Sequence, residues 1–220
     1  MNSQLFAAIE PKGLKSEERI LLAAIKIFAD YPPELASIRM IAREAKVNYS
    51  AITYHFRTKE NLYQEVIRRT VDSVARSYSL PGMLQPETPI PDPESAKLEL
   101  RAFLGRLIDF LYANPYAVSL AKIVLREHLT PSAIYEQLNT DIFKKVLDRM
   151  VNVVFCITGE TDRRQAALQF FSMAGQVLGF RIQRELLVRH LDFTGFSAIE
   201  IEELKTLIFK NIFRQMGVQP

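Results

Sequence analysis

The sequence lacks the features on which catalytic and metal-binding proteins depend. Among its 220 residues there is one cysteine, Cys156, so no disulfide can form within the chain. The three histidines, His55, His128 and His190, stand at no metal-ligand spacing from one another. The sequence also has no glycine-rich phosphate loop, nucleophile elbow or HExxH pattern. We therefore expect no enzyme, no cofactor and no metal site, and we expect Cys156 to pack as a small hydrophobic residue.

Long hydrophobic runs are missing as well. No apolar stretch reaches the roughly 18 residues that a membrane span needs, and the amino-terminal residues show no signal-peptide pattern. A hydrophobic content of 48% with 24% charged residues is ordinary for a soluble globular protein. The sequence thus predicts a cytoplasmic protein with no membrane partner.

The small net charge of +3 is unevenly placed. Residues 1–80 hold 12 Lys and Arg against 9 Asp and Glu, whereas the remaining 140 residues hold 16 of each sign. The excess positive charge therefore lies in the amino-terminal part, where a polyanion would dock. Because the excess is small, we expect a few local phosphate contacts and no broad basic surface.

Helical periodicity extends through almost the whole chain, and no strand pair or internal repeat is evident. Five prolines fall between Leu80 and Pro93 and mark a surface loop. After that loop the pattern predicts helices over 94–113, 116–129, 132–156, 162–189 and 198–216. The expected fold is all-α, with a flexible arm (1–14), an amino-terminal three-helix domain (15–75) and a second helical domain (76–220). The arm is expected to be disordered, the alternative being a minor-groove contact through Lys12 and Lys15.

The stretch from Ser37 to Lys59 predicts two short helices joined by a tight turn. Ser37 and Asn48 are good N-caps, since their side-chain oxygens can accept from free backbone N–H groups. The residues expected to face inward recur every three to four positions: Ile38, Ile41, Ala42, Ala45, Ala51, Ile52, His55 and Phe56. Tyr49, Ser50, Thr53 and Tyr54 are left facing outward.

Such a helix, with hydroxylated and aromatic outer residues and flanking cations, suits the major groove of DNA. Capped helix N-termini and cations can hold phosphates. The predicted DNA contacts are Ser37, Arg39, Asn48, Tyr49, Ser50, Ala51, Thr53, Tyr54, Arg57 and Lys59. By pattern alone, an ordinary solvated helix hairpin remains an alternative.

The segment from Leu21 to Leu62 resembles the DNA-binding domain of the TetR family of bacterial transcriptional repressors. The resemblance depends on Ile20, Ala23, Ala24 and Phe28, on Ser37-Ile38-Arg39, Ile41-Ala42, Ala45 and Val47, and on Ile52, Tyr54-His55-Phe56 and Thr58-Lys59-Glu60-Asn61-Leu62. It implies a helix-turn-helix domain that binds a DNA operator, with Lys59 at the DNA backbone. The chain departs from the family at Lys46, where glycine is usual, and at Thr53, where tyrosine is usual.

The last two helices are apolar around more of their circumference than one core requires. On the 198–216 helix the apolar residues span about 240°, about twice the stripe of a helix packed on one side. We therefore expect a homodimer built on a four-helix bundle, which would place two DNA-reading helices about 34–36 Å apart. The predicted interface residues are Phe170, Ala174, Val177, Leu204, Ile208 and Ile212. A single large core is the alternative.

Three polar residues at inward-facing helical positions suggest an effector site. Glu127, His128 and Arg181 fall among apolar neighbours, and buried charges are costly unless paired. The hypothesis is that Glu127 and Arg181 pair directly or through a ligand, with His128 nearby. The alternative is that these side chains lie near helix ends and reach water.

The second domain resembles the CecR-like branch of the TetR family. The similar residues are Arg126-Glu127-His128-Leu129-Thr130-Pro131-Ser132-Ala133, Tyr135 and Gly179-Phe180-Arg181. The resemblance implies a small hydrophobic or amphipathic effector that releases a dimeric repressor from a palindromic operator. The alternative function is an all-helical ligand-binding or scaffold protein without specific DNA binding.

Overall fold

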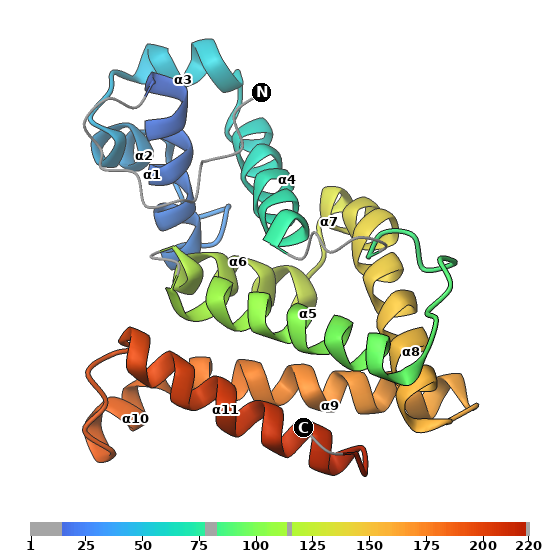
Figure 1. Ribbon diagram of the computed structural model, residues 1–220. Helices are drawn as coiled ribbons and strands as arrows, with labels where there is room; N and C mark the ends of the chain where they lie inside the picture. The colour runs from blue at the N-terminus through green and yellow to red at the C-terminus, as the bar shows by residue number, and fades with distance from the viewer. Residues whose placement is uncertain (1–14, 78–82, 114–115, 219–220) are drawn as a thin grey trace. The chain divides into compact units, whose positions relative to one another are not determined.

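The computed structural model describes residues 15–77, 83–113 and 116–218, and every element in these ranges is helical. This confirms the all-α class, while the expected arm (1–14) lies outside the described residues. The helices, in chain order, are α1 (Ser16–Asp30), α2 (Ile38–Ala45), α3 (Tyr49–Phe56), α4 (Lys59–Ser77), α5 (Pro93–Ala113), α6 (Ala117–Leu129), α7 (Ala133–Leu138), η1 (Asn139–Phe143), α8 (Lys144–Thr158), α9 (Arg163–Ile182), α10 (Arg184–His190) and α11 (Ala198–Gln215) (Figure 1).

Two expected helices are interrupted. The segment 132–156 is divided into α7, the π-helical turn η1 and α8, and the segment 162–189 is divided at Gln183 into α9 and α10. The π-helical turn begins at Asn139-Thr140-Asp141, three residue types with low helix propensity. Hydrophobic periodicity continues across both interruptions, which is why the sequence pattern did not reveal them.

The helices form two compact units. The amino-terminal unit combines α1 to α4 with α6 and α7, and the carboxy-terminal unit contains α5, η1 and α8 to α11. Residues 114–138 join the amino-terminal helices, because α6 packs on α1. The expected two-domain arrangement had assigned α6 and α7 to the second domain.

The amino-terminal unit is organised by capped helices around a small core. Phe28, Ile41, Ile52 and Leu62 are fully buried there. The Ser37 hydroxyl accepts from Met40 N at 3.2 Å, the Asn48 side chain accepts from Ala51 N at 2.9 Å, and the Thr58 hydroxyl accepts from Asn61 N at 3.1 Å. These caps satisfy free backbone donors, and those at Ser37 and Asn48 set the starts of α2 and α3 at the residues that the sequence predicts.

The turn between α2 and α3 contains the departure from the TetR pattern. Lys46 occupies the left-handed region, with φ 52° and ψ 48°, where a glycine would meet no steric penalty. Its N–H closes α2 on Arg43 O at 3.2 Å, and Val47 N donates to Ala42 O at 3.0 Å. The turn keeps its geometry with a residue less suited to it.

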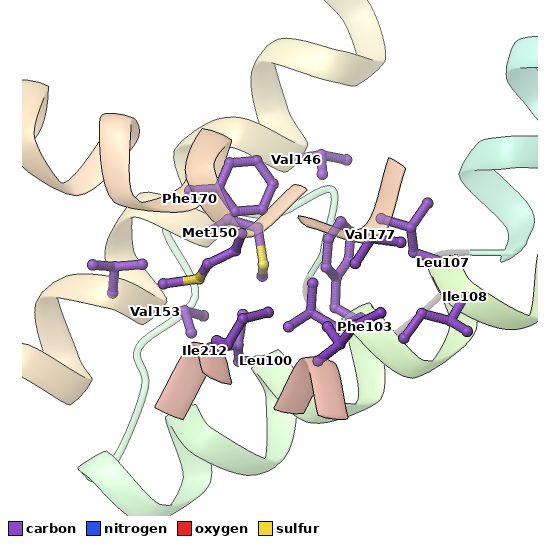
Figure 2. Packing of buried hydrophobic residues seen from close by; sticks show 14 of the residues in the cluster. Leu100, Phe103, Leu107, Ile108, Val146, Met150, Val153, Phe170, Val177 and Ile212 are labelled. Atoms are coloured by element: carbon purple, nitrogen blue, oxygen red, sulfur yellow. The ribbon is translucent and has the colours of Figure 1, made fainter. Parts of the chain in front are cut away.

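A second core holds the carboxy-terminal unit together. In Figure 2, side chains from α5, α8, α9 and α11 meet in one cluster that includes Leu100, Phe103, Met150, Phe170 and Ile212. At its edge, the buried Arg149 pairs with Glu99 at 2.6 Å and also donates to Thr88 O. Arg149 therefore attaches the proline-rich loop to α8.

Cys156 packs against the edge of this core and is half-buried. Burial raises the pKa of its thiol, which disfavours the reactive thiolate. This position agrees with the expectation that Cys156 packs as a small hydrophobic residue.

Glu200 at the start of α11 gives the carboxy-terminal unit a pH dependence. Loss of solvent contact would raise the pKa of this carboxyl, but hydrogen bonds from the backbone N–H groups and hydroxyls of Thr194 and Ser197 lower it to about 2. Because the folded pKa lies below its ordinary value of 4.5, Glu200 stabilises the fold fully above pH 4.5 and loses this effect as the pH falls towards 2.

We therefore expect native protein to lose melting temperature more steeply than Glu200→Gln between pH 4.5 and 2. Melting curves of the two proteins across this range measure the difference, which should be largest near neutral pH and smallest at the acid end. Parallel curves would show that the carboxylate makes no such contribution.

Candidate DNA-binding surface

The outward face of α3 is arranged as the sequence predicts. Tyr49 is 56% exposed, Tyr54 is 83% exposed, and Ser50 and Thr53 are exposed as well, whereas Ala51 is half-buried. Ile52 and Phe56 are buried on the opposite side and hold the helix against its unit. One side of α3 therefore presents hydroxyl and aromatic groups to solvent without any change in the fold.

His55 is exposed, so the prediction that it faces inward is wrong. Its ring lies edge-on to Tyr54, with 5.1 Å between the centroids. Two residues, Ile52 and Phe56, are enough to anchor an eight-residue helix, and His55 is rotated about 100° away from Phe56. His55 therefore belongs to the exposed side of α3, which the spacing of the apolar residues did not indicate.

The cap of α3 constrains two predicted contacts. The Asn48 side-chain oxygen accepts from Ala51 N and also from the Ser50 hydroxyl at 3.0 Å. The oxygen of Asn48 is therefore engaged in fixing the helix start. Ser50 is held in one orientation at the N-terminal end of the exposed face.

The predicted phosphate-binding cations differ in their availability. Arg39 and Arg57 are exposed, as is Ser37, whose oxygen caps α2. The Lys59 ammonium is half-buried and donates to Ala36 O at 3.0 Å. Lys59 thus holds the loop that precedes α2, a role that sequence reasoning did not foresee.

Helix α6 fastens the end of α1 through two cations. The Arg126 guanidinium donates to Phe28 O and, at 3.3 Å, to Ala29 O, and Lys122 pairs with Asp30 at 2.7 Å. The last turn of α1 contains no basic residue of its own. Arg126 therefore satisfies carbonyl groups that the helix leaves free and complements its dipole.

Glu127 is 2% exposed, which confirms that it points inward, but its predicted pairing with Arg181 is wrong. One carboxylate oxygen accepts from the Tyr63 hydroxyl of α4 at 2.5 Å, and the other accepts from Ser132 N at 2.9 Å and the Ser132 hydroxyl at 2.7 Å. Burial, reinforced by the Glu127 carboxylate, raises the pKa of Tyr63 far above its usual range. Glu127 ties α4 to α6, whereas Arg181 belongs to the other unit.

His128 is exposed, so the prediction of an inward histidine is also wrong. Its ring lies beside the buried Tyr135, whose hydroxyl is 3.0 Å from Nδ1, and Nδ1 lies 2.8 Å from Val124 O. Burial, followed by the charges of Glu127 and Glu136, raises the pKa of Tyr135 to about 12. Glu127, His128, Ser132 and Tyr135, which belong to the CecR-like pattern, thus form a hydrogen-bonded structural cluster at the end of α6.

The predicted dimer-interface residues are wrong, because almost all of them are buried within their own unit. Phe170, Val177, Leu204, Ile208 and Ile212 are buried in the core of their own unit, and Ala174 is half-buried. These side chains are not available as the main contacts of a second chain.

The same two helices nevertheless expose other large apolar residues, here called the exposed apolar face: Leu168, Phe171, Leu178, Ile199 and Leu207. Phe171 is 57% exposed and Leu207 is 43% exposed. A shallow hollow runs along α11 and is lined by Ile199, Thr206 and Leu207, among others. Helices α9 and α11 are also joined by a hydrogen bond, in which the Gln176 amide donates to the Gln215 side-chain oxygen at 3.0 Å.

Comparison with known proteins places these features in a family. The profile of the bacterial regulatory proteins of the TetR family matches residues 20–66, and that of the C-terminal domain of the HTH-type transcriptional dual regulator CecR matches residues 96–217. The chain belongs to the TetR family of transcriptional regulators and has a CecR-type C-terminal domain. It is a DNA-binding transcriptional regulator of a non-enzymatic family, which decides against the alternative of a scaffold without DNA binding.

Individual relatives agree with this assignment. The chain is 25% identical over 200 residues to the HTH-type transcriptional dual regulator CecR of Shigella flexneri, covering 89% of this chain and 88% of the relative. Its fold is similar to that of Mycobacterium smegmatis AmtR, with a TM-score of 0.61, 17% identity and coverage of 95% and 98%. It is similarly close to a TetR-like transcriptional regulator from Rhodococcus sp. RHA1, with a TM-score of 0.60, 14% identity and coverage of 93% and 97%. Among the described helices, none is long and apolar enough to cross a membrane.

Proposed function

We propose that this regulator reads an operator through the exposed side of α3, and that the predicted contacts Arg39, Tyr49, Thr53, Tyr54 and Arg57 lie against DNA. The observation that carries the proposal is the division of α3 into a buried side and a hydroxylated, aromatic side. An α-helix fits the major groove, and exposed hydroxyl groups can meet base edges or phosphates there. Ser37 and Asn48 cap the starts of α2 and α3, and Ser50 donates to the Asn48 side chain. The small side chain of Ala51 allows α3 to lie close to the DNA, and Lys59 supports the loop before α2.

We further propose that the regulator acts as a homodimer that uses the exposed apolar face of α9 and α11. A monomer would leave Phe171 and Leu207 in water next to other apolar side chains, and burying such surface favours association. A two-fold dimer carries two copies of α3, which suits a palindromic operator with half-sites one helical turn apart.

Release by a small hydrophobic or amphipathic effector completes the proposal. An effector that binds the carboxy-terminal unit must favour the arrangement in which the two α3 helices no longer match the operator, with a coupling of about 1–3 kcal/mol. Repression follows if the operator overlaps a promoter. The Shigella flexneri relative is described as a dual regulator, and activation would use the same DNA contacts at a different operator position.

Selection of bound fragments from a random DNA pool tests the central proposal. The expected product is a short palindromic sequence whose half-sites repeat at about one helical turn. Enrichment of a single unpaired half-site would contradict the dimeric arrangement, and the absence of any enriched sequence would contradict specific reading by α3.

Two tyrosine substitutions should have different effects on DNA binding. Tyr54→Ala is expected to lower affinity for all sequences by about tenfold, as befits the loss of one backbone contact. Tyr49→Ala, at the start of the helix, is expected to change the preferred operator more than the overall affinity. Gel-shift titrations against the selected operator and single-base variants measure both effects, and Tyr31→Ala is the control because Tyr31 is exposed outside this surface. Equal affinities for native protein and Tyr54→Ala would exclude Tyr54 from the interface.

A further inference from the structure

Arg181, in the last turn of α9, is a half-buried cation without a carboxylate partner among the described side chains. Its guanidinium carbon lies 5.4 Å from the centroid of the Phe196 ring. Burial, followed by the positive charge of Arg184, lowers the pKa of Arg181. Within the described ranges, Arg184 forms an ion pair with Glu185 at 2.7 Å, and Glu185 is exposed. Positive charge is therefore concentrated at the end of α9 and the start of α10.

The wall behind Arg181 is aromatic and firmly held. Phe196 is buried although its φ of 70° lies in the left-handed region, a conformation that a bulky residue keeps only when its surroundings enforce it. Tyr112 packs edge-on against Phe196 with 4.5 Å between centroids, and its hydroxyl donates to Val177 O. Phe193 meets the other side of the cluster, with its centroid 6.3 Å from that of Phe196. The loop before α11 thus fixes the ring that Arg181 covers.

The same loop brings the second cation close. Gly195 has φ 109°, and a Cβ atom added there would lie 2.6 Å from a terminal nitrogen of Arg184. The Arg184 guanidinium therefore lies directly against the backbone of this loop at Gly195. Two guanidinium groups and an aromatic wall are thereby gathered at the junction of α9, α10 and the loop before α11.

We propose that Arg181, assisted by Arg184, binds the anionic group of a small amphipathic organic acid. This inference rests on the proposed effector-dependent function and names the chemical class of the effector. A planar guanidinium binds a carboxylate, sulfonate or phosphate through two parallel hydrogen bonds, and its face remains free to stack on Phe196. Ile182 is exposed next to Arg181 on α9, outside the exposed apolar face, and offers apolar contact for the remainder of the ligand.

A matched pair of probes separates charge recognition from general hydrophobic binding. Decanoate and decan-1-ol share a ten-carbon chain and differ in the charged group. Their competition for bound anilinonaphthalene sulfonate can be followed by fluorescence on the full chain without DNA. Native protein should bind decanoate at least about tenfold better than decan-1-ol, and Arg181→Gln should bring the ratio close to one. Arg189→Gln, at an exposed arginine of α10, should keep the native ratio.

Two further measurements keep the test independent of folding and of DNA binding. In native protein, the preference for decanoate should weaken as salt concentration rises, since the contact is electrostatic. Equal binding of the two probes by native protein, or an unchanged ratio in Arg181→Gln with native melting behaviour, would overturn the proposal. Gel shifts with the selected operator measure DNA binding separately. Native protein that binds the operator but shows no preference for decanoate would contradict the proposed ligand class and leave the proposed DNA-binding function intact.

Discussion

Replacing Glu127 by alanine is expected to lower the free energy of unfolding of the amino-terminal unit by about 3 kcal/mol. The carboxylate is buried and accepts three hydrogen bonds, one from Tyr63 and two from Ser132. Removing it leaves the Tyr63 hydroxyl and the Ser132 donors without their partner, and each unsatisfied buried group costs about 1–3 kcal/mol. Urea denaturation followed by circular dichroism measures the change.

The substitution should also loosen the contact between α4 and α6, because Tyr63 belongs to α4. Amide hydrogen exchange should therefore quicken in both helices. The conservative variant Glu127→Gln should lose about half as much stability, since its amide oxygen can still accept from Tyr63 while its NH₂ group faces the Ser132 donors.

Two controls make the result specific. Tyr63→Phe removes one donor and should reproduce part of the Glu127→Ala effect. Glu34→Gln changes an exposed carboxylate of the same unit and should leave the unfolding curve unchanged. A native unfolding curve for Glu127→Ala would mean that these hydrogen bonds contribute no net stability.

Introducing a charge into the exposed apolar face is expected to separate the proposed homodimer. Leu207→Glu and Phe171→Glu each place a carboxylate where the proposed interface would exclude water. Burying an unpaired charge costs several kcal/mol, so the dimer dissociation constant should rise by at least about 100-fold. Sedimentation velocity over a concentration series measures this shift, and the affinity for a palindromic operator should fall with it.

Leu98→Glu provides the matched control. Leu98 is an exposed leucine of α5 in the same unit, outside the exposed apolar face. It should leave both the sedimentation behaviour and the melting temperature unchanged. Should all three variants remain dimeric, the second chain must use another surface, and a monomeric native protein would exclude the dimer itself.

Local features of the DNA-binding surface were predictable because they depend on residues close in sequence. The caps at Ser37, Asn48 and Thr58 each join residues three apart, and Ile52 and Phe56 define the buried side of α3 within one turn. The edge of a buried stripe is harder to locate. His55 and His128 lie at such edges, and the neighbouring helices alone determine that both remain in solvent.

Long-range pairing was outside the reach of the sequence pattern. The hydroxyl that binds Glu127 belongs to Tyr63, 64 residues earlier, and nothing in the helical spacing distinguishes it from Arg181 as a partner. The wide apolar surfaces of α9 and α11 were recognised correctly. The inner and outer sides of these two helices are equally apolar in sequence. Only packing against α5 and α8 shows that Phe170 and Ile208 belong to the core.

The contact between Arg126 and the last carbonyl groups of α1 affects any attempt to exchange the amino-terminal helices α1 to α4 between regulators of this type. A fragment that stops after α4 would contain every residue that we propose to face DNA, yet it would lack the Arg126 side chain that closes its first helix. The fragment from α1 to α4 therefore lacks a contact that the intact protein uses to complete α1. A graft that carries it into another regulator must bring along α6, or replace what α6 supplies.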